Sequence, residues 1–399
     1  LMILDYEYEG FYCPSLTMTQ GNCTDTYQEQ VYVYPSNCYC TAVDDDYDPN
    51  VYYAWYWDID AGTEEQWDDR QVWINDRIII EEGATLTVKN CTIHMGPKGI
   101  IVVEPKAQLN SIASIFTSWE LGADCDHMWQ GIEVHGQSPY FPDPMIGSVN
   151  FYGSPEAPSI IKNAHIAVLL GERNIGYTCQ VESNEVALPF FIQGYDGKME
   201  VGNQNVTFEN NGIDIKMIRS MYYPYNNSSK IKNCDFICTS PLLDPAYNIT
   251  HPDRYGFGMS PYGYPNQVNP RNPWAGPANE YQRTVYGIWT QMQNFTAVKG
   301  CNFNNIEVGI ESHDSKYMVA DCEFLQLRRG IDIHNSMADM ASNHEIVNNT
   351  FNLIPGDANE IGYHIRINGG LYDKIHDNTF GNLFTTTQGL NSIGIQTVA

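Results

Sequence analysis

Carboxylates and histidines two residues apart recur in short, glycine-led segments of the second half of the chain. The segments "GIESH" (309–313) and "GIDIH" (330–334) each have this spacing, and "GYHIR" (362–366) follows them. Alternate residues of a β-strand face the same side, so both members of each pair would face outward. Carboxylates on adjacent strands would lie about 5 Å apart, and those two strands apart about 10 Å, which brackets the two glycosidase geometries. The candidate catalytic residues are Glu311, Asp332 and His334.

Stacking of such strands would align their outward side chains in two columns. The first column would hold Glu133, Asp214, Trp289, Glu311, Asp332, His364 and Gln396, and the second would hold His135, Lys216, Gln291, His313, His334 and Arg366. Within these columns the candidate binding residues are Trp289, His313, His364 and Arg366. The alternative is that acids and bases on neighbouring strands form ordinary cross-strand pairs. The catalytic signatures of pectinase-type β-helices, Gly-His-Gly or Asp-Asp, are missing from these strands, which weakens the catalytic interpretation.

A repeat at fixed spacing would position these segments. Cys301 and Cys322 are 21 residues apart, and so are Phe303 and Phe324. Comparable short strands recur every 21 to 32 residues along the chain, and none shows helical periodicity. This pattern predicts an all-β fold, a parallel β-solenoid in which each turn lies about 4.8 Å from the next.

The repeat places a small residue two positions before an aromatic or apolar residue, with Asn, Asp or Gly in front. The aromatic positions predict an inward column of Phe208, Phe236, Phe303, Phe324, Phe351 and Phe380, with Ile93 and Ile166 below. The small positions predict a second inward column of Cys91, Ala164, Val206, Cys234, Cys301, Cys322, Asn349 and Asn378. We expect its four cysteines to be buried free thiols rather than nucleophiles, because apolar surroundings raise a thiol's pKa.

The net charge of −27, with 21 Lys plus Arg among 399 residues, excludes several partners. Nucleic acids and anionic membrane surfaces require a cationic face, so we expect neither. No apolar run approaches the roughly 20 residues of a membrane helix, so we expect no membrane span. We predict no metal site and no firmly bound cofactor, and the alternative is a divalent ion held by Glu311, Asp332 and the histidines. Ca2+ is the one ion that "DDDYD" (44–48) would suit, although the segment lacks the glycine and glutamate of an EF-hand loop.

Cysteine usage suggests an oxidising compartment. The chain has 11 cysteines, and Cys13, Cys23, Cys38 and Cys40 cluster at its start among Tyr, Thr and Asn. Such a segment builds little core, so we expect these four to form disulfides outside the cytoplasm. Half of a metal site is the alternative, but no second Cys/His pair follows at zinc spacing. We assign residues 1–62 to a cysteine-rich cap or docking segment and residues 63–399 to the solenoid.

Two insertions are predicted to leave the regular repeat, at 218–229 and 238–286. The longer one is rich in Pro, Gly, Asn and Tyr, and a loop of this length in a compact domain is usually functional or disordered. Its aromatic side chains would either pack onto the solenoid wall or bind a glycan or a protein. The candidates for binding are Tyr255, Tyr262, Tyr264 and Trp274.

The run "IEEGATLTVKNCTIHM … IIVVEPKAQL … CDHMWQGIEVHG" resembles the secreted right-handed parallel β-helix proteins of Bacteroidota, and the resemblance extends from about Val72 to the C-terminus. Its most specific part is the "MWQGIEVHG" block (128–136). The resemblance implies a right-handed parallel β-helix, a secreted or cell-surface-attached location, export by the type IX system and usually no proven activity. Members generally end in a small sorting domain, and none is visible before Ala399.

These features favour a non-enzymatic extracellular protein with a structural or adhesive role, binding an extracellular glycan or a surface protein through its aromatic loops. The alternative is a polysaccharide hydrolase or lyase that uses the carboxylate and histidine face. The final segment "NSIGIQTVA" (391–399) still alternates as a strand. We therefore expect its edge to be covered by a following domain or by head-to-tail contact with another copy, which would build a filament. A chain that stops before further turns is the other interpretation.

Overall fold

The structure is a computed structural model of the 399-residue chain. It describes residues 10–12, 15–20, 23–28, 31–33, 51–119, 127–136, 147–171, 198–201, 205–218, 230–231, 234–240, 242–243, 257–262, 274–275, 280–282, 286–291, 296–314, 317–335, 345–352, 362–369, 374–381 and 392–398. Within these ranges the chain is all-β, and no helix in them is long and apolar enough to cross a bilayer.

Most strands belong to three ladders, because each strand pairs in parallel with the strands about one turn before and after it. The first ladder holds β5 (Val51–Ile59), β7 (Gln71–Ile80), β10 (Ile100–Val103), β13 (Gly131–Val134), β16 (Ile166–Leu170), β19 (Ile213–Ile218), β22 (Phe257–Tyr262), β25 (Tyr286–Gln291), β28 (Val308–His313), β31 (Arg329–His334), β34 (Gly362–Asn368) and β37 (Ser392–Val398).

The second ladder shares the first halves of β5 and β7 and continues through ten further strands. It holds β9 (Thr92–Met95), β12 (Ile115–Ser118), β15 (Ser159–Lys162), β18 (Val206–Glu209), β21 (Cys234–Ile237), β24 (Glu280–Gln282), β27 (Asn302–Asn304), β30 (Glu323–Leu325), β33 (Thr350–Asn352) and β36 (Thr379–Gly381).

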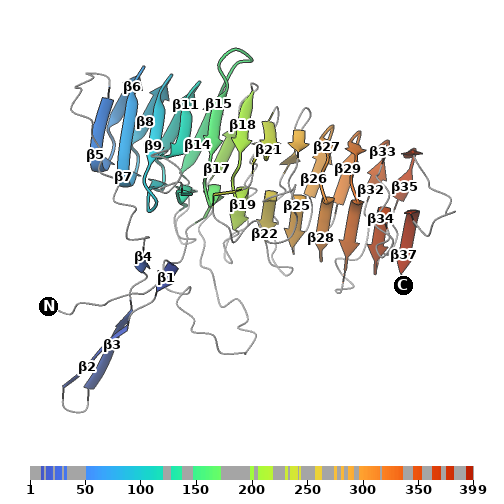
Figure 1. The fold of residues 1–399 in the computed structure, drawn as a ribbon, viewed down its shortest axis with the longest axis horizontal. Helices are drawn as coiled ribbons and strands as arrows, with labels where there is room; N and C mark the ends of the chain where they lie inside the picture. The colour runs from blue at the N-terminus through green and yellow to red at the C-terminus, as the bar shows by residue number, and fades with distance from the viewer. Residues whose placement is uncertain are drawn as a thin grey trace.

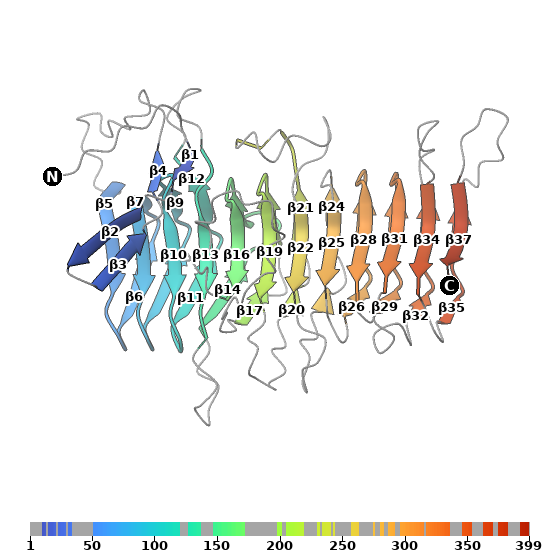
Figure 2. The ribbon, with the colours of Figure 1, turned by 90° about the horizontal axis from the view of Figure 1, so that it is seen from below.

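The third ladder forms a separate 11-stranded sheet. It holds β6 (Glu64–Asp68), β8 (Thr85–Lys89), β11 (Gln108–Ile112), β14 (Ser148–Tyr152), β17 (Lys198–Val201), β20 (Lys230–Ile231), β23 (Trp274–Ala275), β26 (Thr296–Lys299), β29 (Tyr317–Ala320), β32 (Glu345–Val347) and β35 (Lys374–His376). Figure 1 shows the turns following one another from β5 in blue to β37 in red, and Figure 2 shows the first ladder side by side. This arrangement is consistent with the parallel β-solenoid that the repeat predicts.

The N-terminal strands are separate from these ladders. β1 (Gly10–Tyr12) pairs antiparallel with β4 (Val31–Val33), and β2 (Ser15–Gln20) pairs antiparallel with β3 (Cys23–Gln28). Cys13, Cys38 and Cys40 lie outside the described residues, and only the backbone of Cys23 is described. The predicted disulfides therefore stay a prediction. The acidic segment 44–48 also lies outside the described residues.

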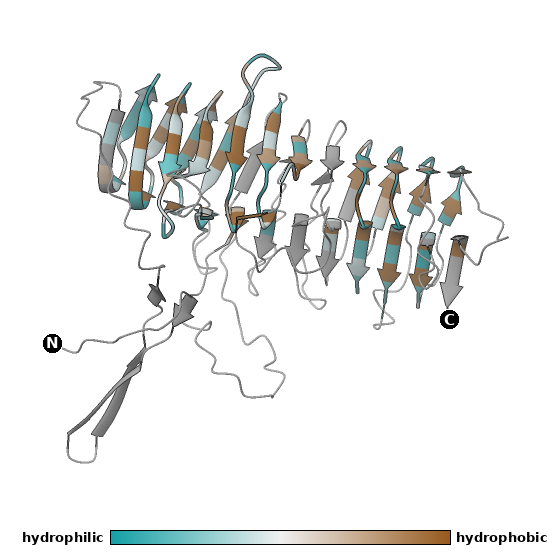
Figure 3. Cartoon of the chain, viewed as in Figure 1, coloured by the Kyte–Doolittle hydropathy of each residue, from teal (hydrophilic) through white to brown (hydrophobic). Residues whose placement is uncertain are grey.

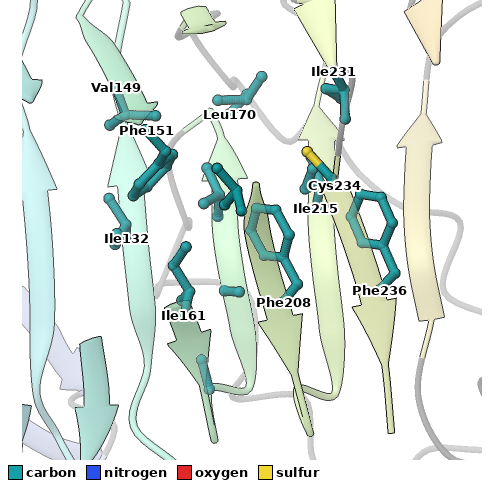
Figure 4. Packing of buried hydrophobic residues seen from close by; sticks show 14 of the residues in the cluster. Ile132, Val149, Phe151, Ile161, Leu170, Phe208, Ile215, Ile231, Cys234 and Phe236 are labelled. Carbon is teal, nitrogen blue, oxygen red and sulfur yellow. The ribbon is translucent and has the colours of Figure 1, made fainter. Parts of the chain in front are cut away.

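Hydrophobic and polar residues alternate along the strands, as Figure 3 shows in brown and teal. The inward residues form one continuous core in which the predicted aromatic column is present. Phe303, Phe324 and Phe351 are register partners on successive turns, and their rings stack with centroids 4.8 and 4.6 Å apart. Figure 4 shows Phe208 and Phe236 continuing this column beside Cys234. Stacked rings of this kind bury a large apolar area on every turn.

Near the N-terminal end of the solenoid, the two inward columns contain other residues than predicted. Ile161 and Phe116 occupy the aromatic column where Ile166 was expected, and Ile166 begins a strand of the first ladder. Ser159, rather than Ala164, is the register partner of Val206 in the column of small residues. The reason is that a turn can have a second corner of the same kind, such as the left-handed Asn163 before Ala164, so the short motif does not distinguish the two corners.

Left-handed backbone explains the Asn, Asp or Gly in front of each small residue. Asn90, Gly300, Asp321, Asn348 and Asp377 have φ values between 51° and 65°. Glycine adopts this region without strain, and Asn and Asp are the side chains that tolerate it best. The next residue then points inward, where its side chain accepts a hydrogen bond from the preceding turn, as described below.

Side chains of the small-residue column bind the backbone of neighbouring turns. The N–H of Cys322 donates to Oδ1 of Asn349 at 2.9 Å, and the N–H of Asn349 donates to Oδ1 of Asn378 at 2.9 Å. The N–H of Cys91 donates in the same way to Oγ of Ser114 at 3.1 Å. A small side chain that can accept a hydrogen bond therefore suits these corners, because a buried N–H must be paired, although Val206 in the same column offers no acceptor.

Glycines open the strands of the first ladder because the aromatic column lies against them. A Cβ on Gly309 would lie 2.8 Å from Cδ1 of Phe324 and 2.7 Å from the carbonyl oxygen of Gly330. A Cβ on Gly330 would be 2.8 Å from Cδ1 of Phe351. The glycine and the phenylalanine of successive repeats are therefore one packing unit, which fixes where the outward residues of each strand begin.

Candidate functional site

The carboxylates and histidines of the sequence motifs lie on the outward side of β28 and β31. Glu311 and Asp332 are register partners on these adjacent strands, and so are His313 and His334. The alternate residues Ile310, Ser312, Ile331 and Ile333 are fully buried in the core. The predicted grouping of Glu311, Asp332, His313 and His334 on one face is thus present in the structure.

Arg366 on β34 completes this group because it is the register partner of Asp332. Its Nε donates to Oδ1 of Asp332 at 2.6 Å, and its Nη2 donates to Oδ2 of the same carboxylate. Nη1 of Arg329 lies 3.8 Å from Oδ2 of Asp332 as well. The Asp332 side chain is 0% exposed, so its charge is balanced by a two-pronged guanidinium contact rather than by water.

Glu311 is paired with the histidine two residues along its own strand. Nε2 of His313 lies 2.8 Å from Oε1 of Glu311, the distance of a hydrogen bond from the imidazole to the carboxylate. The hydrogen bond to Glu311 raises the pKa of His313, against the opposing effect of partial burial. This bond favours the imidazolium form and holds the ring in one orientation.

His334 is held by two neighbours of opposite charge. Its Nε2 lies 3.0 Å from Oδ1 of Asp332 and 3.1 Å from Nη2 of Arg366. One nitrogen can donate to the carboxylate or accept from the guanidinium, but it does only one of these at a time. The Asp332, His334 and Arg366 side chains therefore form one coupled network in which a proton on His334 alters both contacts.

Aromatic rings line up beside this network. The imidazoles of His313 and His334 stack with centroids 5.1 Å apart and an angle of 10° between their planes. The ring of Trp289 on β25 lies 5.9 Å from that of His313 at 46°. On the far side, the guanidinium of Arg366 lies over the ring of Tyr363, 4.8 Å from its centroid. The face therefore combines planar rings with a fixed charge network.

Two of the expected outward residues occupy other positions. His364 aligns with Gly330 rather than with Asp332, and it is fully buried, 5.3 Å from the ring of Phe380 and 6.0 Å from that of Phe351. Asp214 is buried as well and accepts a hydrogen bond from Nδ2 of Asn211 at 2.8 Å. Desolvation raises the pKa of the Asp214 carboxyl well above its usual value. Both residues were predicted two positions out of register and do not belong to the outward face.

Four of the remaining predicted residues form two pairs. Lys216 and Arg366 belong to the first outward column rather than the second, because Lys216 pairs with Leu169, and Arg366 pairs with Asp332 and Gln396. Glu133 and His135 form a similar carboxylate–imidazole pair at 3.2 Å. That pair is five ladder steps away from β28, which is roughly 24 Å at the strand spacing.

The aromatic residues of the predicted insertion are described only in part. Tyr255 and Tyr264 lie outside the described residues. Tyr262 is in β22 and Trp274 is in β23, and only their backbone pairing is described. The segment 238–286 includes β22, β23 and β24, so part of it follows the three ladders rather than leaving them.

Sequence reasoning missed three residues of the face, namely Arg329, Tyr363 and Asn368. The signal that would have found them is the spacing of the inward isoleucines. "IDIHN" (331–335) and "IRING" (365–369) align by their two isoleucines, which pairs Asp332 with Arg366 and His334 with Asn368. Alignment of Gly362 with Gly330 shifts β34 by two residues, and it wrongly places His364 on the outward face beside Asp332.

The contacts within this face limit the reactions that its side chains can catalyse. Both oxygens of Asp332 already accept hydrogen bonds from Arg366, and the carboxylate is shielded from water. An acid or base for glycoside cleavage must reach the glycosidic oxygen or a water, so Asp332 does not meet that requirement in this arrangement. Among the described residues, no group of three or more His, Cys, Asp or Glu side chains could hold a metal ion.

No known protein-family profile matches the chain, and neither the curated proteins nor the solved structures contain a significant match. The function is therefore inferred from the geometry of the chain itself.

Proposed function

We propose that the chain is a non-catalytic extracellular or cell-surface protein in which a right-handed parallel β-helix serves as a rigid scaffold for an adhesive or structural role. The proposed ligands are an extracellular glycan or a surface protein. The acidic composition, the cysteine-rich start and the resemblance to secreted β-helix proteins support this location.

The observation that carries the proposal is the state of the candidate carboxylates. Asp332 is fully buried and bound through both oxygens to Arg366, and Glu311 is bound to His313. Retaining and inverting glycosidases both need one carboxyl group to give up a proton and the other to attack or activate water. Carboxylates that are engaged in ion pairs and hydrogen bonds of this kind serve the stability and shape of a face instead.

The fold supports a scaffold role in a second way. Stacked turns present equivalent residues at a regular spacing, so a solenoid provides long, flat faces that do not depend on mobile loops. The first ladder is such a face, because its twelve strands pair in parallel one after another from β5 to β37, with a shift of register between Ala54 and Tyr56 where β5 pairs with β7. A ligand that repeats along its own length would match a surface of this kind.

The test is product detection alongside binding. The purified chain is incubated with neutral and acidic polysaccharides, and reducing ends, unsaturated products and retained protein are measured together. We expect retention without products for the wild-type chain. A polysaccharide hydrolase or lyase would release products, and Glu311→Gln or Asp332→Asn would abolish the release while the circular dichroism spectrum stays unchanged.

A control variant on another face shows whether an effect is specific to Glu311 and Asp332. Glu345 on β32 is an outward acid of the third ladder and the register partner of Lys374. Glu345→Gln removes one carboxylate from a different face. Turnover that disappears in the Glu311 and Asp332 variants but survives in Glu345→Gln would overturn the non-catalytic proposal in favour of the enzyme.

A further inference from the structure

The outward face of β25, β28 and β31 carries a row of three neighbouring planar rings: His313 and His334 are register partners, and Trp289, the register partner of Glu311, lies beside His313. We propose that this row, hereafter the ring platform, binds a neutral, extended polysaccharide that lies along the axis of the solenoid. The inference rests on the non-catalytic binding role proposed above and names the ligand class and the residues that contact it.

The rings form a continuous series across successive turns. His313 and His334 stack almost parallel at 5.1 Å, and Trp289 follows at 5.9 Å. Because the two imidazoles stack on each other, they cover one another's facing surfaces and offer their edges to a ligand, and the C–H groups of a pyranose ring pack against aromatic edges as well as faces. The series runs in the direction in which turns succeed each other, at about 4.8 Å per strand. A linear chain of sugar rings would therefore meet one protein ring after another.

The rings are held in place before any ligand binds. Glu311 fixes His313 through a 2.8 Å hydrogen bond, and Asp332 lies 3.0 Å from Nε2 of His334. Arg366 in turn holds Asp332 through both of its oxygens. Side chains that are already fixed lose little conformational entropy on binding, and this increases affinity. The charge network thus acts as the support of the platform rather than as catalytic machinery.

The rings are also accessible. The side chain of His313 is 36% exposed and that of His334 is 30% exposed, whereas the carboxylates that hold them are 12% and 0% exposed. Trp289 is half-buried. Asn368, the register partner of His334 on the next turn, extends the same column with an amide that can donate to and accept from hydroxyl groups. Rings with a polar neighbour suit a ligand with alternating apolar faces and hydroxyls.

The negative charge of the chain favours a neutral polysaccharide over an acidic one as the ligand. The chain carries a net charge of −27, and the two carboxylates of the face are balanced only by the groups that bind them. An acidic polymer would be repelled by the protein as a whole and would compete with Asp332 for Arg366. A neutral, β-linked chain, which is flat and extended, meets neither obstacle.

The experiment uses cellohexaose and β-1,4-mannohexaose as probes on the full chain. Binding is followed by calorimetry, and the histidine C–H resonances are followed by NMR. We expect millimolar or tighter binding that shifts resonances of His313 and His334. Trp289→Ala, His313→Ala and His334→Ala should each raise the Kd about tenfold, the effect of losing the contact between one protein ring and the sugar chain. His334→Gln keeps a group that can hydrogen-bond Asp332 and should lose a similar factor, because the ring is gone.

The control variant is His376→Ala, which removes an exposed histidine from β35 on the third ladder and should leave the Kd unchanged. Each variant is checked by circular dichroism and by its melting temperature. Binding that is equal in wild type and in all ring variants would overturn the platform. So would the absence of any histidine shift at millimolar probe, or a preference for polygalacturonate over both neutral probes.

Two further outcomes separate this inference from the proposed function. Cleavage of a probe that Glu311→Gln abolishes would overturn the non-catalytic role, while loss of binding in the ring variants would still support the platform. A protein partner that binds through these rings, with no binding of either oligosaccharide, would overturn the platform as a glycan site and leave the non-catalytic role standing.

Discussion

Arg366 and Asp332 are register partners on adjacent strands, and the guanidinium of Arg366 binds both oxygens of the fully buried Asp332 carboxylate. This single contact joins two turns of the solenoid and also determines what the outward face can do. It takes the most protected carboxylate out of acid–base chemistry, and it fixes His334, whose Nε2 lies within 3.1 Å of both partners.

The first prediction is that this pair contributes strongly to stability. Arg366→Gln leaves a buried carboxylate without its main partner, so we expect the free energy of unfolding to fall by about 3 kcal/mol. Asp332→Asn in the same chain should restore part of the loss, because the uncompensated charge is then gone. Urea unfolding of the wild type, both single variants and the double variant measures the coupling. Strictly additive losses would contradict the ion pair.

The second prediction concerns pH. The hydrogen bond from His313 to Glu311 raises the pKa of His313 in the folded chain, so protonated His313 stabilises the fold. This contribution is fully present below the unfolded pKa of about 6.5 and is lost as the pH rises through the higher folded pKa. The effect is of the order of 0.5 kcal/mol, because solvent screens this partly exposed pair.

An NMR titration of the His313 ring measures this shift directly. Glu311→Gln removes the carboxylate that causes it and should return the midpoint toward the ordinary histidine value. A midpoint that is the same with and without Glu311 would show that the hydrogen bond does not control the protonation of His313.

The inward side of the fold was the more predictable part. Phe303, Phe324 and Phe351 recur at one position of the repeat, and because a ladder stacks equivalent residues, the column follows directly from the spacing. The grouping of Glu311 with Asp332 followed for the same reason. The predicted register was wrong for strands in which the glycine does not occupy the same position relative to the inward isoleucines. A shift of two residues keeps the inward and outward alternation but changes every cross-strand partner.

His364 illustrates why the glycine is an unreliable guide. In β28 and β31 the position beside the aromatic column is Gly309 or Gly330, because a Cβ there would meet a phenylalanine ring. In β34 that position is His364, which is buried edge-on to the ring of Phe380. The histidine side chain fits at this position because of how the phenylalanine rings of the neighbouring turns are placed, and the local motif carries no information about that placement.

The third prediction tests the packing of glycine against the aromatic column. Gly309→Ala would place a Cβ 2.7 Å from a backbone oxygen and 2.8 Å from the Phe324 ring, so we expect a loss of about 3 kcal/mol in the free energy of unfolding. Gly381→Ala is the control, since its Cβ would have no neighbour closer than 3.4 Å and should cost less than about 1 kcal/mol. Equal melting temperatures for the two variants would contradict the proposed packing unit.

The fourth prediction concerns the buried thiols. Cys91, Cys234, Cys301 and Cys322 form no disulfide and are at most 1% exposed, as the repeat predicted, and Cys238 is a fifth buried cysteine outside any disulfide. Burial raises the pKa of Cys91 and raises that of Cys301 well above its usual value, so the reactive thiolate is scarce as well as inaccessible.

We therefore expect these thiols to react with iodoacetamide only after unfolding. Thr350→Cys, on the exposed side of β33, provides a thiol that should react at the normal rate in the same sample. Mass spectrometry of peptides from native and urea-treated chains measures the labelling of the buried cysteines and of the introduced cysteine in each state. Protection on the order of a thousandfold or more is expected if alkylation requires opening of the core, because the opening must disrupt stacked turns on both sides. Fast labelling of Cys322 in the native chain would show that the corner column opens locally, and the hydrogen bond from its N–H to Asn349 would then be too weak to close the turn.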